Sequence, residues 1–389
     1  MRFPYPYLHS SIRRFSQTLR RYGTRQGIEE QTLPFYRQKQ YYPVRIGTIF
    51  KNRYRVIAKL GYGAYSTVWL GLDDKLKKYA SLKICVREDT KASPVLNEVA
   101  MLQRLGEFAQ EADHPGLDFT RLAQDIFEIN GPSGPIIVWS RNHRDLVFAL
   151  CKNLSSMLYC QNFSSVIHTD ISPQNVLAEI EDDISLKDVE EQESQDLSIP
   201  VISHGGPVYQ SRAAMLELSG IPILTDFGQM RPSEPGNRDW WMSDLYRAPE
   251  VLLKLLWGFP VDIWSIGIMI LELLEGKNLF DPIDRTNNQY VILLALAQYI
   301  GYLGPPSLEI IKQSPIFSMY FDDQRDWVSG TQIPQTSFED FVTTIPPGEE
   351  KDTFLRFIRK MLTWDPEARA TANEIIEDEW LMRPVDEMV

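Results

Sequence analysis

The chain has 389 residues, 43% of them apolar and 24% charged, and is long enough to bury one large core or two of medium size. Its longest uncharged apolar stretch, 263–271, has nine residues, whereas a membrane-spanning helix needs roughly 20, and three scattered cysteines exclude a disulfide framework. The formal net charge of −12 argues against direct binding of nucleic acid and favours basic partners.

The first segment, 1–45, is expected to be a basic N-terminal extension. Residues 1–28 contain six arginines and no acid, so the rest of the chain is six charges more negative than the whole. Arginine, serine and aromatic residues in this proportion are typical of a mitochondrial transit peptide and equally of a disordered basic tail. The composition leaves both interpretations open.

Regular structure is expected to begin near Tyr54, in a small β-rich lobe over about 54–140. Three short runs rich in Val, Tyr, Trp, Ile and Leu, separated by Gly-containing or charged turns, predict an antiparallel meander. The runs are Tyr54–Leu60, Ser66–Leu72 and Tyr79–Val86. Apolar residues at intervals of three and four then predict a helix over 94–105.

A larger, mainly α-helical lobe is predicted over about 141–383, which gives the chain an α+β fold class. The clearest helix, 261–274, is apolar nearly all round and is therefore expected at the centre of its lobe. Thr371 and Glu374 have the spacing of a capping box. Residues 179–196 contain nine acids and one lysine, so we expect about 179–221 to form a solvated acidic insertion.

A glycine-rich segment joins the first two predicted strands, and its glycines allow backbone amides to approach phosphate closely. The segment reads Leu60-Gly61-Tyr62-Gly63-Ala64-Tyr65-Ser66-Thr67-Val68. Lys83 follows in an apolar strand, where an unpaired ammonium would be unstable, and Glu98 comes fifteen residues later. These residues resemble the nucleotide-binding part of the protein kinases, except that Ser66 replaces the third glycine. The resemblance implies that residues 60–68 and Lys83 bind ATP, and that Glu98 pairs with Lys83.

The strongest single signal is His168-Thr169-Asp170-Ile171-Ser172-Pro173-Gln174-Asn175, which resembles the catalytic loop of the protein kinases. The resemblance implies that Asp170 accepts the proton of the substrate hydroxyl and that Asn175 binds Mg²⁺. Asp226, in Asp226-Phe227-Gly228, resembles the second metal ligand of the family. Phosphoryl transfer needs little covalent help, so a positioned carboxylate and a metal clamp would supply most of the catalysis.

Three more signatures follow in the order that the family has them. They are Tyr246-Arg247-Ala248-Pro249-Glu250, the segment 262–267, and Trp364-Asp365-Pro366 with Arg369. In the family, the counterparts of Glu250 and Arg369 pair. The resemblance covers most of the chain and implies a protein kinase domain over 46–383 that transfers the γ-phosphoryl group of ATP to protein Ser/Thr hydroxyls, with Mg²⁺.

Within the kinases, three features resemble the SR-protein kinases and their fungal relatives. They are Thr169 where most kinases have Arg, a spacing of 51 residues between Asn175 and Asp226, and the sequence of 66–70. This resemblance implies basic, Arg-Ser-rich protein substrates and a location in cytoplasm and nucleus, against the mitochondrial alternative. Because Thr169 cannot pair with a phosphate, we expect activity that does not need phosphorylation between Asp226 and Glu250.

Two departures from the kinase pattern leave a second hypothesis open. Ser172 stands where Ser/Thr-directed kinases usually carry Lys, and only 29 residues separate Trp139 from His168, fewer than kinases generally use. If 145–158 is the long helix, 140–144 must serve as the hinge. Either the nucleotide pocket is open on that side or the sequence lacks an exon. The chain is then an active protein kinase, or a pseudokinase that binds ATP or acts as a scaffold; a third alternative, a small-molecule phosphotransferase, has no motif in its favour.

Overall fold

The computed structural model describes residues 27–34, 36, 37, 40–87, 93–111, 117, 120, 122–131, 134–141, 165–178, 183–203, 206–212, 222–324 and 326–382. These residues form two compact units. The first contains the described residues up to 141 and those within 177–228, and the second contains 165–176 and the described residues from 229 onward. Among the helices of the described ranges, none has the length and apolar character needed to cross a bilayer.

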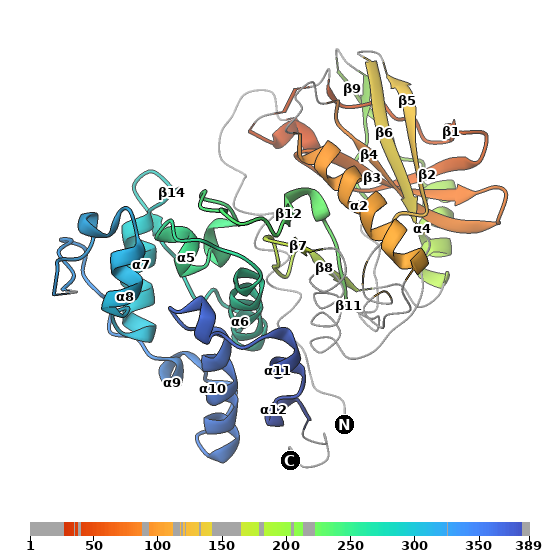
Figure 1. The fold of residues 1–389 in the computed structure, drawn as a ribbon. Coiled ribbons are helices and arrows are strands. Elements are labelled where there is room, and N and C mark those ends of the chain that lie inside the picture. The colour runs from red at the N-terminus through yellow and green to blue at the C-terminus, as the bar shows by residue number, and fades with distance from the viewer. Residues whose placement is uncertain are drawn as a thin grey trace. The chain divides into compact units, whose positions relative to one another are not determined.

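The first unit is built on a six-stranded antiparallel sheet with the strand order β1-β2-β3-β4-β6-β5 (Figure 1). Its strands are β1 (Ile49–Phe50), β2 (Tyr54–Gly63), β3 (Ser66–Asp73), β4 (Lys78–Cys85), β5 (Asp125–Gly131) and β6 (Gly134–Arg141). The predicted meander is confirmed as β2, β3 and β4. Along much of β4 every second side chain is buried, as expected for a strand with one face on the core.

The core of the first unit includes residues that precede the sheet in the chain. Val44 is only 1% exposed, and the half-buried Tyr42 and Ile46 pack with it against a cluster that contains Trp69. A short 3₁₀ helix, η1 (Glu29–Thr32), also belongs to this unit. The fold therefore begins well before Tyr54, and the basic extension predicted over 1–45 is structured over its described last part. Three apolar residues in five are too short a run to give a periodic signal.

The helix predicted over 94–105 is present as α2 (Pro94–Glu111), six residues longer than expected. Its first residue is a proline, which suits the first turn of a helix because no intrahelical N–H bond is lost there. The buried side chains recur every three to four residues and form one face. They are Val95, Glu98, Met101, Leu102 and Leu105.

The acidic insertion differs from the prediction. It contains α4 (Ile184–Gln195), β9 (Val201–Ser203), β10 (Gly206–Val208) and β11 (Pro222–Leu224), and its described residues belong to the first unit. Figure 1 shows α4 beside the sheet. Leu186 and Val189 of α4 are buried against Leu70 and Tyr79 of the sheet. Buried Glu193 pairs with Arg212. The prediction missed this helix because its two buried apolar residues, three apart, lie in a charged run.

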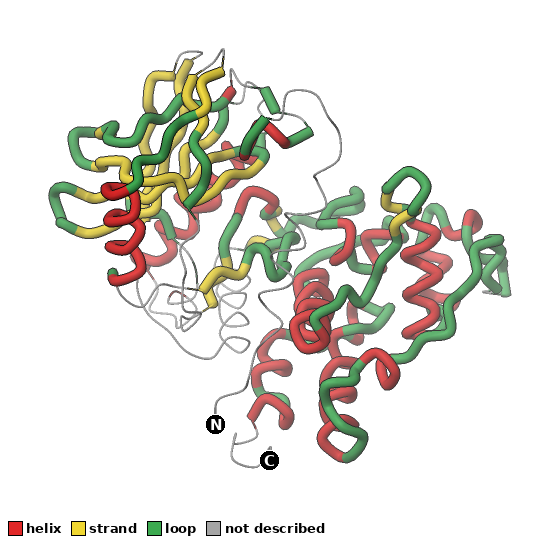
Figure 2. Tube along the Cα trace, turned by 180° about the vertical axis from the view of Figure 1, so that it is seen from behind, coloured by secondary structure: helices red, strands yellow, loops and turns green. Residues whose placement is uncertain are grey.

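The second unit is mainly helical (Figure 2). Its helices are α5 (Pro249–Leu252), α6 (Pro260–Glu275), α7 (Ile292–Leu303), α8 (Leu308–Gln313), α9 (Phe338–Phe341), α10 (Glu349–Met361), α11 (Ala372–Ile376) and α12 (Glu379–Met382). Short strands pair as β7 (Val166–Ile167) with β12 (Arg231–Pro232), and as β13 (Ile283–Asp284) with β14 (Gln289–Tyr290). The capping box of Thr371 and Glu374 at the start of α11 is confirmed.

Helix α6 lies at the centre of the second unit, as its composition predicted, because every side chain from 261 to 271 is buried. It packs against α10, whose apolar residues lie on one face with acids in the first turn and bases in the last. The contact requires a glycine. A β-carbon on Gly267 would lie 2.8 Å from a methyl carbon of Leu362 and 3.1 Å from the β-carbon of Met361. The missing side chain thus lets the two helices approach closely.

Candidate active site

The glycine-rich segment forms the hairpin between β2 and β3, with Gly63 paired to Ser66 across a turn of two residues. A β-carbon added to Gly61 or Gly63 would meet no atom within 4 Å, so both glycines leave open space beside the backbone. Ser66, in the place of the third glycine, is buried. Phosphate oxygens can therefore approach the amides of this hairpin without displacing a side chain.

Lys83 lies in the middle of the sheet, where β4 pairs with β3 on one side and β6 on the other. Its ammonium is 2.6 Å from a carboxylate oxygen of Glu98 in α2, so the predicted ion pair is present. Burial on its own lowers the pKa of Lys83, but the negative charges of Glu98 and Asp226 outweigh it and raise the pKa above the ordinary value. Lys83 is therefore a cation held beside two carboxylates.

Asp226 is exposed and has a positive φ of 65°, a conformation in which side chains other than glycine are strained. The neighbouring residues fix it. Phe227 is buried, and the Asn97 side-chain amide donates to the Gly228 carbonyl at 2.9 Å. Since Asn97 precedes Glu98 in α2, this helix positions both the partner of Lys83 and the backbone that carries Asp226.

The predicted catalytic loop lies in the second unit. The Asn175 side-chain amide donates to the backbone carbonyl of Asp170 at 2.7 Å and to its carboxylate at 2.8 Å. The buried Asp262 carboxylate at the start of α6 accepts the backbone N–H groups of His168 and Thr169, each at 2.8 Å. The loop is thus fastened to the central helix of its unit, and Asp170 and Asn175 are held together.

Sequence reasoning missed two residues of this site. The Ser243 hydroxyl donates to the second carboxylate oxygen of Asp170. The Trp241 indole N–H donates to the Gln229 carbonyl at 2.9 Å and to the Thr169 hydroxyl at 3.1 Å. Arg231 lies over the Trp241 ring, with 3.7 Å between the guanidinium carbon and the ring centroid. The residues between 229 and 247 contain no motif at fixed spacing that would have identified either one.

Thr169 forms hydrogen bonds between uncharged groups at the position where most kinases carry a cation. Its hydroxyl donates to the Gln229 carbonyl at 2.7 Å, and it accepts from Trp241 as described above. Further along the same segment, Arg247 donates to the backbone carbonyls of Trp241 at 2.9 Å and Met242 at 3.0 Å. The segment before Glu250 is therefore held by hydrogen bonds from Thr169, Trp241 and Arg247 to backbone carbonyls.

The predicted pair of Glu250 and Arg369 is confirmed. Two guanidinium nitrogens lie 2.7 and 3.0 Å from the two carboxylate oxygens, and both side chains are fully buried. The same guanidinium donates to the backbone carbonyls of Pro260 at 2.7 Å and Thr363 at 3.0 Å. The pair thus connects the start of α5 to the start of α6 and to Thr363, which precedes the signature Trp364-Asp365-Pro366.

Some features that the sequence predicted take no part in the contacts described above. Ser172 is buried, and its backbone carbonyl accepts the Asn175 N–H at 3.0 Å. Ser140 and Arg141 belong to β6, while the rest of the predicted hinge, 142–144, and the helix predicted over 145–158 lie outside the described residues. Lys83, Glu98 and Asp226 belong to the first unit, and Asp170 and Asn175 belong to the second.

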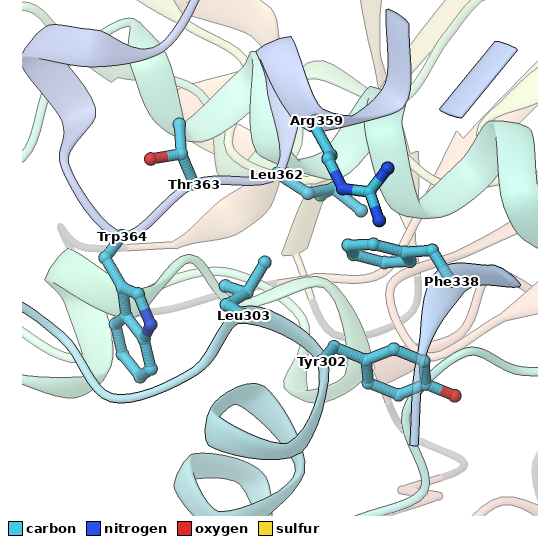
Figure 3. Close-up of a pocket in the computed structure, with 7 residues that line it drawn as sticks. All are labelled: Tyr302, Leu303, Phe338, Arg359, Leu362, Thr363 and Trp364. Atoms are coloured by element: carbon cyan, nitrogen blue, oxygen red, sulfur yellow. The ribbon is translucent and has the colours of Figure 1, made fainter. Parts of the chain in front are cut away.

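A cavity of about 210 Å³ also lies in the second unit (Figure 3). Its lining residues are Tyr302, Leu303, Phe338, Arg359, Leu362, Thr363 and Trp364. The Arg359 guanidinium is 2.6 Å from a carboxylate oxygen of Glu339. The cavity contains none of the residues predicted to bind nucleotide or metal, so it is separate from the candidate active site.

Oxygen donors of the kind that Mg²⁺ prefers are present at both predicted metal positions, the carboxylate of Asp226 and the side-chain amide oxygen of Asn175. Magnesium ions at nucleotide sites are usually held by one or two such groups together with phosphate oxygens. Within the described ranges, His, Cys, Asp and Glu side chains form no cluster of three or more that could hold a metal ion. The donor set fits an ion that arrives with a nucleotide.

A β-rich unit that joins a glycine-rich hairpin to a Lys–Glu pair, and a helical unit that presents an Asp–Asn loop, are together the parts of a protein kinase. A family model described as "Protein kinase domain" matches residues 214–381. A serine/threonine protein kinase of Aspergillus fumigatus is 33% identical over 378 residues, which cover 91% of each chain. The chain therefore belongs to the serine/threonine protein kinases.

Other relatives are more distant. The serine/threonine-protein kinase SRPK of Physarum polycephalum is 25% identical over 396 residues, with 91% of each chain covered. The DYRK-family kinase pom1 of Schizosaccharomyces pombe is 24% identical, over 93% of this chain and 31% of its own. The resemblance to SR-protein kinases is thus confirmed at the level of the sequence. These comparisons give no support to the pseudokinase alternative.

Proposed function

We propose that this kinase transfers the γ-phosphoryl group of ATP to Ser or Thr hydroxyls of basic, Arg-Ser-rich proteins. The proposal rests on the surroundings of the Asp170 carboxylate. One of its oxygens is held by the Asn175 amide, and the other accepts a hydrogen bond from an aliphatic hydroxyl, that of Ser243. A carboxylate in this environment is suited to accept and orient a substrate hydroxyl of the same chemical kind.

The roles of the remaining site residues are proposed from the resemblance to the protein kinases, and their contacts are compatible with these roles. Lys83, kept cationic beside Glu98, binds the α- and β-phosphates, and the amides of the hairpin over 60–68 enclose the phosphate chain. Asn175 and Asp226 would supply the protein ligands of Mg²⁺, which would neutralise charge on the phosphate oxygens. Each of these groups acts by position and charge rather than by covalent bonding, as phosphoryl transfer requires.

In the proposed reaction, the substrate hydroxyl oxygen forms a bond to the γ-phosphorus, and the bond between that phosphorus and the bridging oxygen breaks. ADP leaves with the electron pair, and the hydroxyl proton passes to Asp170. The cation that most Ser/Thr-directed kinases place at position 172 is replaced here by a buried serine. Loss of one positioned charge costs on the order of 2–4 kcal/mol in comparable enzymes, so we propose a slow catalyst.

Two observations support basic substrates. The chain carries 52 acidic and 40 basic residues, with six of the arginines confined to residues 1–28, so its remaining surface attracts cations. One relative is named as an SRPK. We propose a cytoplasmic and nuclear location on the same resemblance. A fluorescent fusion that accumulated in mitochondria would favour the alternative suggested by the arginine-rich start of the chain.

The test is transfer of labelled phosphate from ATP with Mg²⁺ to an Arg-Ser repeat peptide and to a neutral Ser peptide. The wild type is compared with Asp170→Ala and with Asp188→Ala, a matched change at an exposed residue of α4. We expect Asp170→Ala to abolish transfer, Asp188→Ala to retain it, and the Arg-Ser peptide to be preferred. Transfer that survives in Asp170→Ala would overturn the assignment of the base. Equal use of both peptides would overturn the substrate class.

A further inference from the structure

The hydroxyl of Tyr41 lies at the tip of the glycine-rich hairpin. It donates toward two backbone carbonyls, those of Gly63 and Ala64, at 3.0 Å each. On the other side of the same turn, the Tyr65 carbonyl accepts the Val86 N–H at 2.8 Å. The carbonyls of Gly63, Ala64 and Tyr65 therefore all accept hydrogen bonds, and the contact from Tyr41 comes from a segment that precedes the sheet in the chain.

The segment that carries Tyr41 is itself anchored at several points. The Gln40 carbonyl accepts the Arg87 N–H at 2.8 Å, next to the end of β4, and Val44 is buried in the core cluster. The Tyr41 ring lies beside that of Tyr36, with 5.0 Å between centroids. Tyr41 is thus held on a fixed support rather than on a free chain end.

A buried ion pair secures the earlier part of this segment. The Lys59 ammonium, completely buried in β2, contacts the Glu30 carboxylate of η1 and lies 3.6 Å from that of Glu29. It also donates to the Tyr209 carbonyl at 3.1 Å, so the insertion takes part in the same junction. Since a buried ammonium left without partners is strongly destabilising, this junction holds η1 on the sheet.

We propose that Tyr41 is a positioning residue for nucleotide binding, which fixes the tip of the glycine-rich hairpin in the conformation that receives the phosphates. The inference rests on the proposed role of residues 60–68 in binding ATP. A hairpin tip that contains two glycines has many accessible conformations, and binding a nucleotide to a free tip would require that freedom to be lost. A tether present before the nucleotide arrives removes part of this loss.

The chemistry of the phenol suits a permanent tether. Burial, followed by the charge of Glu30, raises the pKa of Tyr41 to about 12, so the hydroxyl keeps its proton and remains a donor over the whole range in which the enzyme would work. One intramolecular hydrogen bond changes an equilibrium roughly 2- to 10-fold. We expect the contribution of Tyr41 to nucleotide affinity to lie in this range.

The experiment compares the wild type with Tyr41→Phe, which removes only the hydroxyl. The matched control is Tyr42→Phe, at the next residue, whose ring packs edge-on against Phe50 at 5.7 Å. The first measurement is hydrogen exchange of the backbone amides of 61–68 in the nucleotide-free protein. The second is the Kd of AMP-PNP with Mg²⁺, and the third is the division of the steady-state effect between KM for ATP and kcat.

We expect Tyr41→Phe to accelerate exchange in 61–68, to weaken AMP-PNP binding roughly 2- to 10-fold, and to raise KM for ATP by a similar factor without lowering kcat. Tyr42→Phe should change none of these quantities. If Tyr41→Phe leaves either the exchange or the Kd unchanged while the wild type binds nucleotide, the proposal for Tyr41 is wrong and the proposed function stands. A wild-type protein that binds no nucleotide would instead overturn the proposed function, and the role of Tyr41 with it.

Discussion

Removing one partner of the buried Glu250–Arg369 pair should destabilise the second unit severely. Both side chains are completely buried, and the guanidinium makes two contacts with the carboxylate and two with backbone carbonyls. In Arg369→Leu, the Glu250 charge would remain in the core without a partner, which costs about 3–5 kcal/mol. Glu250→Gln should lower the free energy of unfolding by less, because the guanidinium still donates hydrogen bonds to the carbonyls of Pro260 and Thr363.

The assay is urea unfolding of the two single variants and of the double variant, analysed as a double-mutant cycle. The double variant should be less destabilised than the sum of the singles, by at least about 2 kcal/mol, since neither charge is then left alone. Arg356→Leu is the control. It removes an ion pair with Glu379 in which both partners are about 60% exposed, and it should cost about 1 kcal/mol or less.

Two results would refute this reasoning. An Arg369→Leu variant that lost no more stability than Arg356→Leu would mean that the buried charge finds water or a proton at little cost. Additive effects of the two core substitutions, within about 0.5 kcal/mol, would mean that the two side chains do not stabilise the fold as a pair.

Activity should fall together with stability, because Glu250 lies at the end of the segment that carries Ser243 and Trp241.

Two further predictions concern the catalytic segment. Ser172→Lys should raise kcat at least ~10-fold, because it restores a cation that stabilises the transition state by on the order of 2–4 kcal/mol. The control is Gln174→Lys, at an exposed position of the same loop, which should leave kcat unchanged. Equal effects of the two substitutions would show that the added charge matters but its position does not. Treatment with a phosphatase should leave the rate of phosphate transfer within about twofold, and so should Ser233→Ala, because Thr169 and Trp241 already hold the segment before Glu250. Strong stimulation by a phosphate on Ser233 or Ser243 would contradict this prediction.

Features encoded at fixed spacing were predictable from the sequence. Lys83 and Glu98, and Glu250 and Arg369, form the contacts that the resemblance implied, and the structure adds a hydrogen bond between Asn175 and Asp170. Glu250 and Arg369 lie far apart in the chain and were found because each belongs to its own recognisable signature, whereas Glu98 was found from its spacing to Lys83. The central helix α6 was equally clear, since a helix buried on all sides is apolar on all sides.

The features that the sequence did not predict depend on single side chains outside any repeat. Tyr41 reaches the hairpin tip through one hydroxyl, and Ser243 reaches Asp170 in the same way. Helix α4 was missed because its charged residues outnumber the apolar ones, although Leu186 and Val189 are enough to pack it on the sheet. A pair of apolar residues three apart is too common to indicate burial without the fold.

The assignment of 177–228 to the first unit has a consequence for how the protein is made. When a ribosome has released the chain as far as β6, the sheet is complete in its strands, but Leu70 and Tyr79 still lack Leu186 and Val189, and Lys59 still lacks the Tyr209 carbonyl. At about 5–20 residues per second, translation from 141 to 209, the last of these missing partners, takes roughly 3–14 s. During that interval the apolar surface around Leu70 and Tyr79 of the nascent sheet is exposed to solvent, and exposed apolar surface of this kind is what chaperones bind.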